Sequence, residues 1–214
     1  MNAPGLLVWD LDGTLVDSRE DIATAANAAL QAIGRPTLPV SAVVVFVGDG
    51  IDALIERLTP GGDAAERARC LAAFKTAYVA GCCQATAAYP GIADALAELS
   101  AAGWIHAVAT NKAGAYVQPI LTHCGIFQHF AACRGGDGIR KPDPWMLHDL
   151  SRELALPVRW MIGDHHTDIR AGQAAGCRVL FCAWGLGQRD GLATDAEART
   201  PAEVARAIAA FPRA

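Results

Sequence analysis

The chain has 214 residues, of which 52% are hydrophobic and 19% are charged, and its formal net charge is -4. This composition supports a domain with a sizeable core and argues against intrinsic disorder. Acidic residues outnumber basic ones, 22 to 18, so there is no basic excess to indicate nucleic acid binding. No apolar run reaches the ~18 residues of a membrane span.

The cysteines and the first residues indicate a compartment. The seven cysteines show no repeated spacing and no Cys-x-x-Cys motif, which is typical of free thiols in a reducing cytoplasm. Residues 1–5 carry no basic side chain and do not resemble a signal peptide. We therefore expect a cytoplasmic protein, a monomer or a homodimer, that binds neither nucleic acid nor a membrane.

The stretch from Leu6 to Trp9 is apolar and leads directly into Asp10-Leu11-Asp12-Gly13. A continuous apolar run predicts a strand buried on both faces, and ligands of open α/β sheets bind where such strands end. Because side chains alternate along a strand, Asp10 and Asp12 should lie on the same side. Gly13 allows a sharp turn and leaves room for a ligand. The two carboxylates would suit Mg²⁺, although an ordinary Asp-Gly turn has the same pattern.

The next part of the chain, residues 18–87, predicts helices and no clear strand. Ser18 and Asp21 have the form of a capping box, and Asp63 can cap a later helix. The expected helices cover residues 18–33, 51–58 and 63–79, while residues 39–47 fit either a helix or a strand. This all-helical block is best explained as an insertion.

From residue 90 onward the pattern alternates between helices and strands. The expected strands are 104–110, 131–134, 158–162 and 178–183, and the expected helices are 91–102, 113–124, 144–154, 167–175 and a last one from Thr200. Such alternation is the signature of a parallel α/β sheet.

Polar residues follow these later strands as they follow the first. The motifs are Thr110-Asn111-Lys112 after one strand, Lys141-Pro142 in a loop, and Gly163-Asp164 after another strand. Each alone has an ordinary explanation, a helix cap or a surface turn. Together with Asp10-Leu11-Asp12-Gly13-Thr14-Leu15, and in this order, they resemble the four motifs of the haloacid dehalogenase-like hydrolases, most of which are phosphatases.

The resemblance implies a fold and a reaction. The fold is a Rossmann-like parallel sheet formed by residues 1–17 and 88–214, with residues 18–87 as a small helical cap. Asp10 would be the nucleophile that forms an aspartyl-phosphate, and Asp12 would be the general acid and base. Thr110 and the backbone N–H of Asn111 would bind the phosphoryl group, and Lys141 would stabilise its charge.

The resemblance also implies Mg²⁺ as the cofactor. Its contributors would be the Asp10 carboxylate, the backbone carbonyl of Asp12 and the carboxylate of Asp164. Asp168 would support the site by holding a metal-bound water or orienting the motif lysine. We expect His165–His166 to be loop residues, since hard Mg²⁺ does not favour imidazole.

Within the family, the segment Val47–Leu58 resembles the cap segment of phosphoglycolate phosphatases. Gly48, Asp49 and Gly50 would then contact the substrate, because the two glycines let backbone approach a ligand and Gly50 precedes a helix. Asp49 departs from the neutral residue that is common there, and its carboxylate would repel a carboxylate substrate. We expect a small phosphorylated metabolite, with 2-phosphoglycolate first and a sugar phosphate or a pyrophosphate as alternatives.

Other activities of related proteins fit less well. Haloacid dehalogenases have no second acid at the position of Asp12. Phosphonate hydrolases use a cap lysine, and the one lysine of this cap, Lys75, lies in a late helix. Nothing in the sequence argues for a β-phosphoglucomutase. A receiver-like module that is phosphorylated without turnover would lack the helical cap.

Overall fold

Six parallel strands form the central sheet of this computed structural model, which describes residues 5–211. Their spatial order is β5-β4-β1-β6-β7-β8. The strands are β1 (Leu6–Trp9), β4 (Ile105–Ala109), β5 (Phe130–Arg134), β6 (Val158–Gly163), β7 (Arg178–Cys182) and β8 (Ala196–Ala198). Because β1 lies in the middle, its carboxyl end meets those of β4 and β6 at one edge of the sheet.

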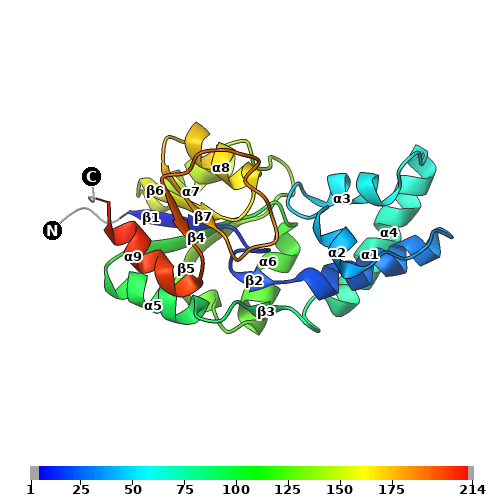
Figure 1. The fold of residues 1–214 in the computed structure, drawn as a ribbon, viewed down its shortest axis with the longest axis horizontal. Coiled ribbons are helices and arrows are strands. Elements are labelled where there is room, and N and C mark those ends of the chain that lie inside the picture. The colour runs from blue at the N-terminus through cyan, green and yellow to red at the C-terminus, as the bar shows by residue number, and fades with distance from the viewer. Residues whose placement is uncertain (1–4, 212–214) are drawn as a thin grey trace.

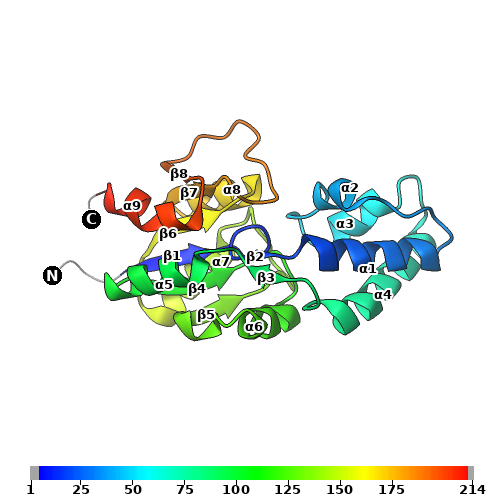
Figure 2. The ribbon, with the colours of Figure 1, turned by 60° about the horizontal axis from the view of Figure 1, so that its bottom comes forward.

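Helices cover both faces of the sheet (Figure 2). Leu7 and Trp9 point to the face covered by α5 (Ile92–Ala101), α6 (Gly114–His123) and α9 (Val204–Ala209). Leu6 and Val8 point to the opposite face, which is covered by α7 (Trp145–Leu154) and α8 (His166–Ala174). All four side chains are fully buried, which explains why the first strand is continuously apolar. Two 3-10 turns, η1 (Phe127–His129) and η2 (Pro201–Glu203), complete this part.

A second group of helices lies beyond the carboxyl end of β1 (Figure 1). It consists of α1 (Arg19–Ala32), α2 (Val40–Val44), α3 (Ile51–Leu58) and α4 (Ala64–Gly81). Two short antiparallel strands, β2 (Val16–Asp17) and β3 (Ala87–Ala88), join it to the sheet. These helices pack around a hydrophobic cluster of their own, separate from those of the sheet. The α/β fold with a helical insert is therefore confirmed, and the domain boundaries at 17/18 and 87/88 stay a prediction.

Most predicted elements are present, with small changes at their ends. The helix at 51–58 is confirmed, and the ambiguous residues 39–47 contain the short helix α2. Asp63 caps α4 by accepting a hydrogen bond from the Glu66 backbone N–H at 2.7 Å. The short strands β2, β3 and β8 were not predicted, because two or three residues show no alternation that can be recognised.

The predicted capping box at the start of α1 is wrong. Ser18 occupies the N-cap position, but its side chain makes no cap hydrogen bond. Its hydroxyl instead donates to Oδ1 of Asp12 at 2.6 Å. The Asp21 carboxylate accepts hydrogen bonds from Ala85 and Thr86 on the segment that returns to the sheet. The two side chains therefore stabilise the two chain segments that connect the helical group to the sheet.

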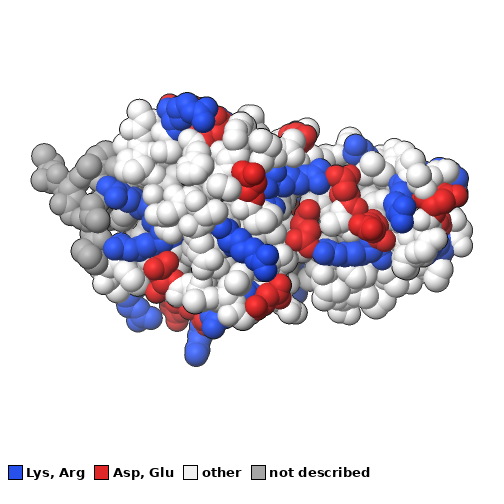
Figure 3. Space-filling view, turned by 90° about the horizontal axis from the view of Figure 1, so that it is seen from above, with Lys and Arg blue, Asp and Glu red and all other residues white. Residues whose placement is uncertain are grey.

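Several surface properties bear on the expected partners. Basic and acidic side chains are interspersed over the face shown in Figure 3. Across residues 5–211, no helix combines the length and the apolar character needed to span a membrane. All seven cysteines are free thiols, and two of them, Cys70 and Cys182, are buried.

Candidate active site

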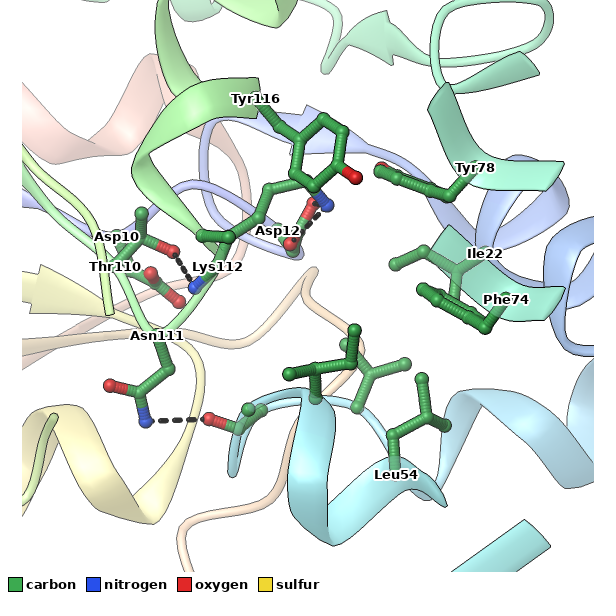
Figure 4. A pocket seen from close by; sticks show the side chains of 15 residues that line it. Asp10, Asp12, Ile22, Leu54, Phe74, Tyr78, Thr110, Asn111, Lys112 and Tyr116 are labelled. Carbon is green, nitrogen blue, oxygen red and sulfur yellow. Dashed lines mark hydrogen bonds and ion pairs between the residues drawn. The ribbon is translucent and has the colours of Figure 1, made fainter. Parts of the chain in front are cut away.

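The sheet topology brings the predicted catalytic residues together. Asp10 follows β1, Thr110 follows β4 and Asp164 follows β6, so their side chains meet at the shared carboxyl edge. Lys141 enters from the loop before α7. The adjacent pocket is lined on the core side by Asp10, Asp12, Thr110, Asn111, Lys112, Ala113 and Tyr116 (Figure 4).

A buried lysine and two carboxylates form the centre of the site. Nζ of Lys141 lies 2.8 Å from Oδ1 of Asp10 and 2.6 Å from Oδ1 of Asp168. The Lys141 side chain is only 1% exposed. Burial lowers the pKa of Lys141, but attraction to Asp10 and Asp168 outweighs burial and leaves that pKa raised. The lysine is therefore a fixed positive charge beside the predicted nucleophile.

Three carboxylates, those of Asp10, Asp164 and Asp168, have oxygens within 4.8 Å of one another. Burial raises the pKa of Asp10 to about 6, against the opposing effect of Lys141. Burial, followed by repulsion from Asp10 and Asp168, raises the pKa of Asp164 to about 7. So much buried negative charge is costly unless a cation compensates it.

The donor set fits Mg²⁺. All three groups offer hard carboxylate oxygens, the ligands that Mg²⁺ prefers. Oδ1 of Asp10 is buried and has no well-directed hydrogen bond, although Lys141 lies at ion-pair distance. Asp10 and Asp164 could therefore hold a metal ion. Asp168 accepts hydrogen bonds from Nζ of Lys141 and from the backbone N–H of His165.

The Asp164 side chain is held in a fixed orientation. Oδ1 accepts a hydrogen bond from the Thr14 hydroxyl at 2.9 Å, and Oδ2 accepts from the backbone N–H groups of Leu186 and Gly187, each at 2.8 Å. A Cβ at Gly13 would lie 2.2 Å from Oδ2 of Asp164, and Gly13 has a φ of +86°. Gly13 thus packs against the predicted metal ligand, and its predicted contact with substrate stays a prediction.

Asp12 has two partners that the sequence analysis did not assign. Its Oδ1 accepts from Ser18, and Nζ of Lys112 lies 3.0 Å from Oδ1 and 2.8 Å from Oδ2. The same ammonium lies 4.6 Å from the ring centroid of Tyr78 on α4. Figure 4 shows Lys112 reaching Asp12 beside Tyr78 and Tyr116. Ser18 could not have been identified from sequence, because it shares its pattern with a helix cap.

The loop before α3 closes over the core side of the pocket. Nδ2 of Asn111 donates to the carbonyl of Gly48 at 2.9 Å and to the carbonyl of Lys141 at 2.9 Å. Nη1 of Arg140 pairs with Asp52 on α3 at 2.7 Å. Asn111 therefore connects the loop that carries Lys141 to the loop before α3 that carries Gly48.

The cap wall of the pocket is largely apolar. Its side chains come from α1, α3, α4 and the loop before α3, and Figure 4 shows those of Ile22, Leu54 and Phe74 on this side. They are those of Ile22, Val47, Ile51, Leu54, Phe74 and Tyr78. Gly48 and Gly50 also line the pocket, but Asp49 does not.

Asp49 turns toward other partners. One of its carboxylate oxygens forms a close ion pair with Arg57, and the other lies 3.5 Å from Nε2 of His166. Its predicted contact with substrate stays a prediction.

Comparisons with known proteins identify the family of the chain. Residues 7–182 match the haloacid dehalogenase-like hydrolase family. A phosphoglycolate phosphatase of Photobacterium profundum is 38% identical over 190 residues, which cover 84% of this chain and 83% of that protein. A phosphoglycolate phosphatase of Nitrosospira multiformis is 34% identical over 202 residues, which cover 90% of this chain and 89% of that protein.

A solved structure extends the likeness to the whole fold. A protein described as a predicted phosphoglycolate phosphatase from Haemophilus somnus superposes with a TM-score of 0.88 at 30% identity. The superposition covers 95% of this chain and 97% of that one. The chain therefore belongs to the haloacid dehalogenase-like hydrolases.

Proposed function

We propose that this protein is a Mg²⁺-dependent phosphatase that hydrolyses a small phosphomonoester, with 2-phosphoglycolate as the first candidate. The observation that carries the proposal is the buried Asp10 carboxylate, which lies 2.8 Å from Lys141 and within the carboxylate cluster of Asp164. The relatives named phosphoglycolate phosphatase support the choice of substrate. The protein would act in the cytoplasm, as a monomer or a homodimer.

The reaction would proceed in two steps, each displacing an oxygen from phosphorus. Asp10 attacks phosphorus in line, the bond to the leaving oxygen breaks, and Asp12 gives that oxygen a proton. A water molecule then attacks the aspartyl-phosphate while Asp12 takes its proton, and this releases phosphate and restores Asp10. Ser18 and Lys112 hold the Asp12 carboxylate in place for both transfers.

Both the phosphoryl group and the nucleophile are negative, so their repulsion must be offset. Lys141 supplies one positive charge, and Thr110 with the Asn111 backbone N–H would donate hydrogen bonds to the phosphoryl oxygens. Mg²⁺, held by Asp10, Asp164 and the Asp12 carbonyl, would neutralise the remaining charge. Asp168 fixes the lysine in position.

The surroundings of Asp49 support a carboxylate substrate. Arg57 pairs with the Asp49 carboxylate, which offsets the charge that would repel a second carboxylate. Lys112 also lines the pocket, where its ammonium is paired with the Asp12 carboxylate. An unpaired Asp49 carboxylate would repel a carboxylate substrate and would instead favour a sugar phosphate or a pyrophosphate.

A substrate panel tests this proposal. Phosphate release from 2-phosphoglycolate, several sugar phosphates, pyrophosphate and p-nitrophenyl phosphate is measured with Mg²⁺ and with EDTA. We expect the highest kcat/KM for 2-phosphoglycolate and no turnover in EDTA. Preference for another substrate would overturn the substrate assignment, and absence of turnover on every member would overturn the phosphatase assignment.

A further inference from the structure

Two adjacent histidines on the core face a carboxylate on the cap. His165 and His166 stand at the start of α8, and Asp49 lies in the loop before α3. Each of the three offers a ligand atom, and these atoms lie within 4.8 Å of one another. The group is separate from the carboxylate cluster around Asp10, and the proposed reaction uses none of its side chains for chemistry.

The distances suit a tetrahedral metal. Nε2 of His166 lies 3.5 Å from Oδ1 of Asp49. Two ligands that are each ~2.1 Å from a tetrahedral ion stand about 3.4 Å apart, so this pair needs almost no movement to share one. The other Asp49 oxygen is taken by Arg57, which fixes the carboxylate with Oδ1 toward the histidines.

The outer partner of His166 also fits. Nδ1 of His166 lies 3.1 Å from Oδ2 of Asp190. Nδ1 of His165 instead accepts a hydrogen bond from the Thr167 backbone N–H at 3.4 Å and lies 3.0 Å from the Thr167 hydroxyl. Metal-binding histidines commonly donate their second ring N–H to a carboxylate or another oxygen, which leaves the far nitrogen for the metal. In His166 that nitrogen is Nε2, which faces Asp49.

The cap loop approaches the second histidine closely enough to complete the group. A Cβ at Gly48 would lie 2.7 Å from Nε2 of His165, and the φ of Gly48 is +119°. Only a glycine therefore lets the loop sit against this ring. The side chains of His166 and Asp49 are 23% and 21% exposed, so an ion can enter from solvent.

We propose that Asp49, His165 and His166 form a second metal site, which binds a borderline transition-metal ion such as Zn²⁺ and ties the cap to the core. Two imidazoles and one carboxylate favour such an ion over Mg²⁺, and water would take a remaining position. The start of α8 is the positive end of the helix and disfavours a cation; Asp49 and Asp190 offset it. This proposal does not depend on the phosphatase reaction.

Metal titration of the whole chain tests the site. Zn²⁺ binding is followed by calorimetry, and Co²⁺ binding by its visible absorption, in excess Mg²⁺ so that the carboxylate cluster is already filled. We expect one saturable site with the spectrum of tetrahedral nitrogen and oxygen ligation. No saturable binding, or a strong sulfur-to-metal band, would overturn the proposal.

Variants assign the ligands. His166→Gln should weaken Zn²⁺ binding by at least ~100-fold, and Asp190→Asn, at an exposed outer partner, by ~10-fold. Exposed His123 on α6 gives the matched control, His123→Gln, with unchanged affinity. Cys82→Ser is the second control, because the Sγ atoms of Cys82 and Cys83 are 3.7 Å apart. Unchanged affinity in His166→Gln, or loss in Cys82→Ser, would contradict the assignment.

The link between cap and core has its own readout. Saturating Zn²⁺ in excess Mg²⁺ should slow turnover of the unmodified protein several-fold relative to its own rate without Zn²⁺, and His166→Gln should not be slowed. This measurement rests on the proposed phosphatase activity, whereas the binding titrations do not. Zn²⁺ binding without inhibition would retain the site and overturn its bridging role, and equal inhibition of both proteins would place the effect elsewhere.

Discussion

The two walls of the pocket are built differently. Most residues of the core wall are polar and follow the ends of β1 and β4, among them Asp10, Asp12 and Thr110. Behind this wall, the buried Lys141 pairs with Asp10 and Asp168. The cap wall is apolar and comes from helices and a glycine-containing loop. The core wall can therefore do chemistry on a phosphoryl group of any substrate, while the cap wall can only select what is attached to it. Changes on the two sides should separate kcat from substrate preference.

The largest effect is expected for Asp10→Asn on the core wall. Without the nucleophile, kcat should fall by at least ~10³-fold for every substrate. Phosphate release measures the loss, and circular dichroism checks that the fold is retained. If the variant turns over phosphoesters at the rate of the unmodified protein, the nucleophile is another residue.

The next largest effect is expected for Asp12. Its carboxylate pairs with Lys112 on the core wall, and the Lys112 ammonium lies over the ring of Tyr78 on the cap wall. Asp12→Asn should lower kcat by ~10²–10⁴-fold for alkyl phosphates, whose leaving oxygen needs a proton. The first step with p-nitrophenyl phosphate should be less affected, because its leaving group needs no proton.

Lys112→Met should also lower kcat more for alkyl phosphates than for p-nitrophenyl phosphate. The loss should be smaller than in Asp12→Asn, since this substitution removes only the partner that orients Asp12. Burst kinetics separate the two steps. An equal loss for both substrate types would show that Asp12 has a structural role only.

A smaller effect is expected on stability, from the raised pKa values of the core carboxylates. In metal-free protein the folded state keeps protons on Asp164 up to about pH 7, whereas an exposed aspartate loses them near its ordinary pKa of 3.8. The contribution of Asp164 to stability is therefore fully present below about pH 4, and it is lost as the pH rises through about 7. Mg²⁺ should compensate, so it should raise Tm more at pH 8 than at pH 5, by roughly 2–4 °C for each kcal/mol gained.

Variants identify the source of that stabilisation. Asp164→Ala should lose most of the Mg²⁺-dependent rise in Tm and should need more Mg²⁺ for activity. His165→Ala should keep both the rise and the Mg²⁺ requirement, since imidazole is not a ligand that Mg²⁺ favours. The reverse ranking would contradict an all-oxygen magnesium site.

The difference between the walls also explains what could be predicted from sequence. A strand that ends in a polar residue points to the carboxyl edge of the sheet, so the convergence of Asp10, Thr110 and Asp164 followed from the order of elements. The partners of Asp12 did not follow, because Ser18 has the pattern of a helix cap and Lys112 reaches across the pocket by tertiary packing.

The cap posed a different difficulty. Apolar residues at helical spacing predicted α3, but the same residues could face either the cap's own core or the pocket. Asp49 contacts Arg57, which is 8 positions away in the sequence, and His166, which is 117 positions away. Nothing local in the sequence specifies such contacts, so the orientation of this loop had to come from the structure.

The smallest and most selective effect is expected on the cap wall, from Asp49→Asn. The substitution removes the negative charge beside Arg57 and leaves that cation uncompensated near the pocket. The kcat/KM for 2-phosphoglycolate should therefore rise relative to a substrate without a carboxylate, such as a sugar phosphate. The change reaches ~1.5–3 kcal/mol only if a contact to a charged substrate group is involved. The value for p-nitrophenyl phosphate should stay close to that of the unmodified protein. Glu56→Gln, which removes an exposed charge from the helix that follows this loop, is the matched control, and equal factors for all substrates in Asp49→Asn would mean that this loop does not read the substrate.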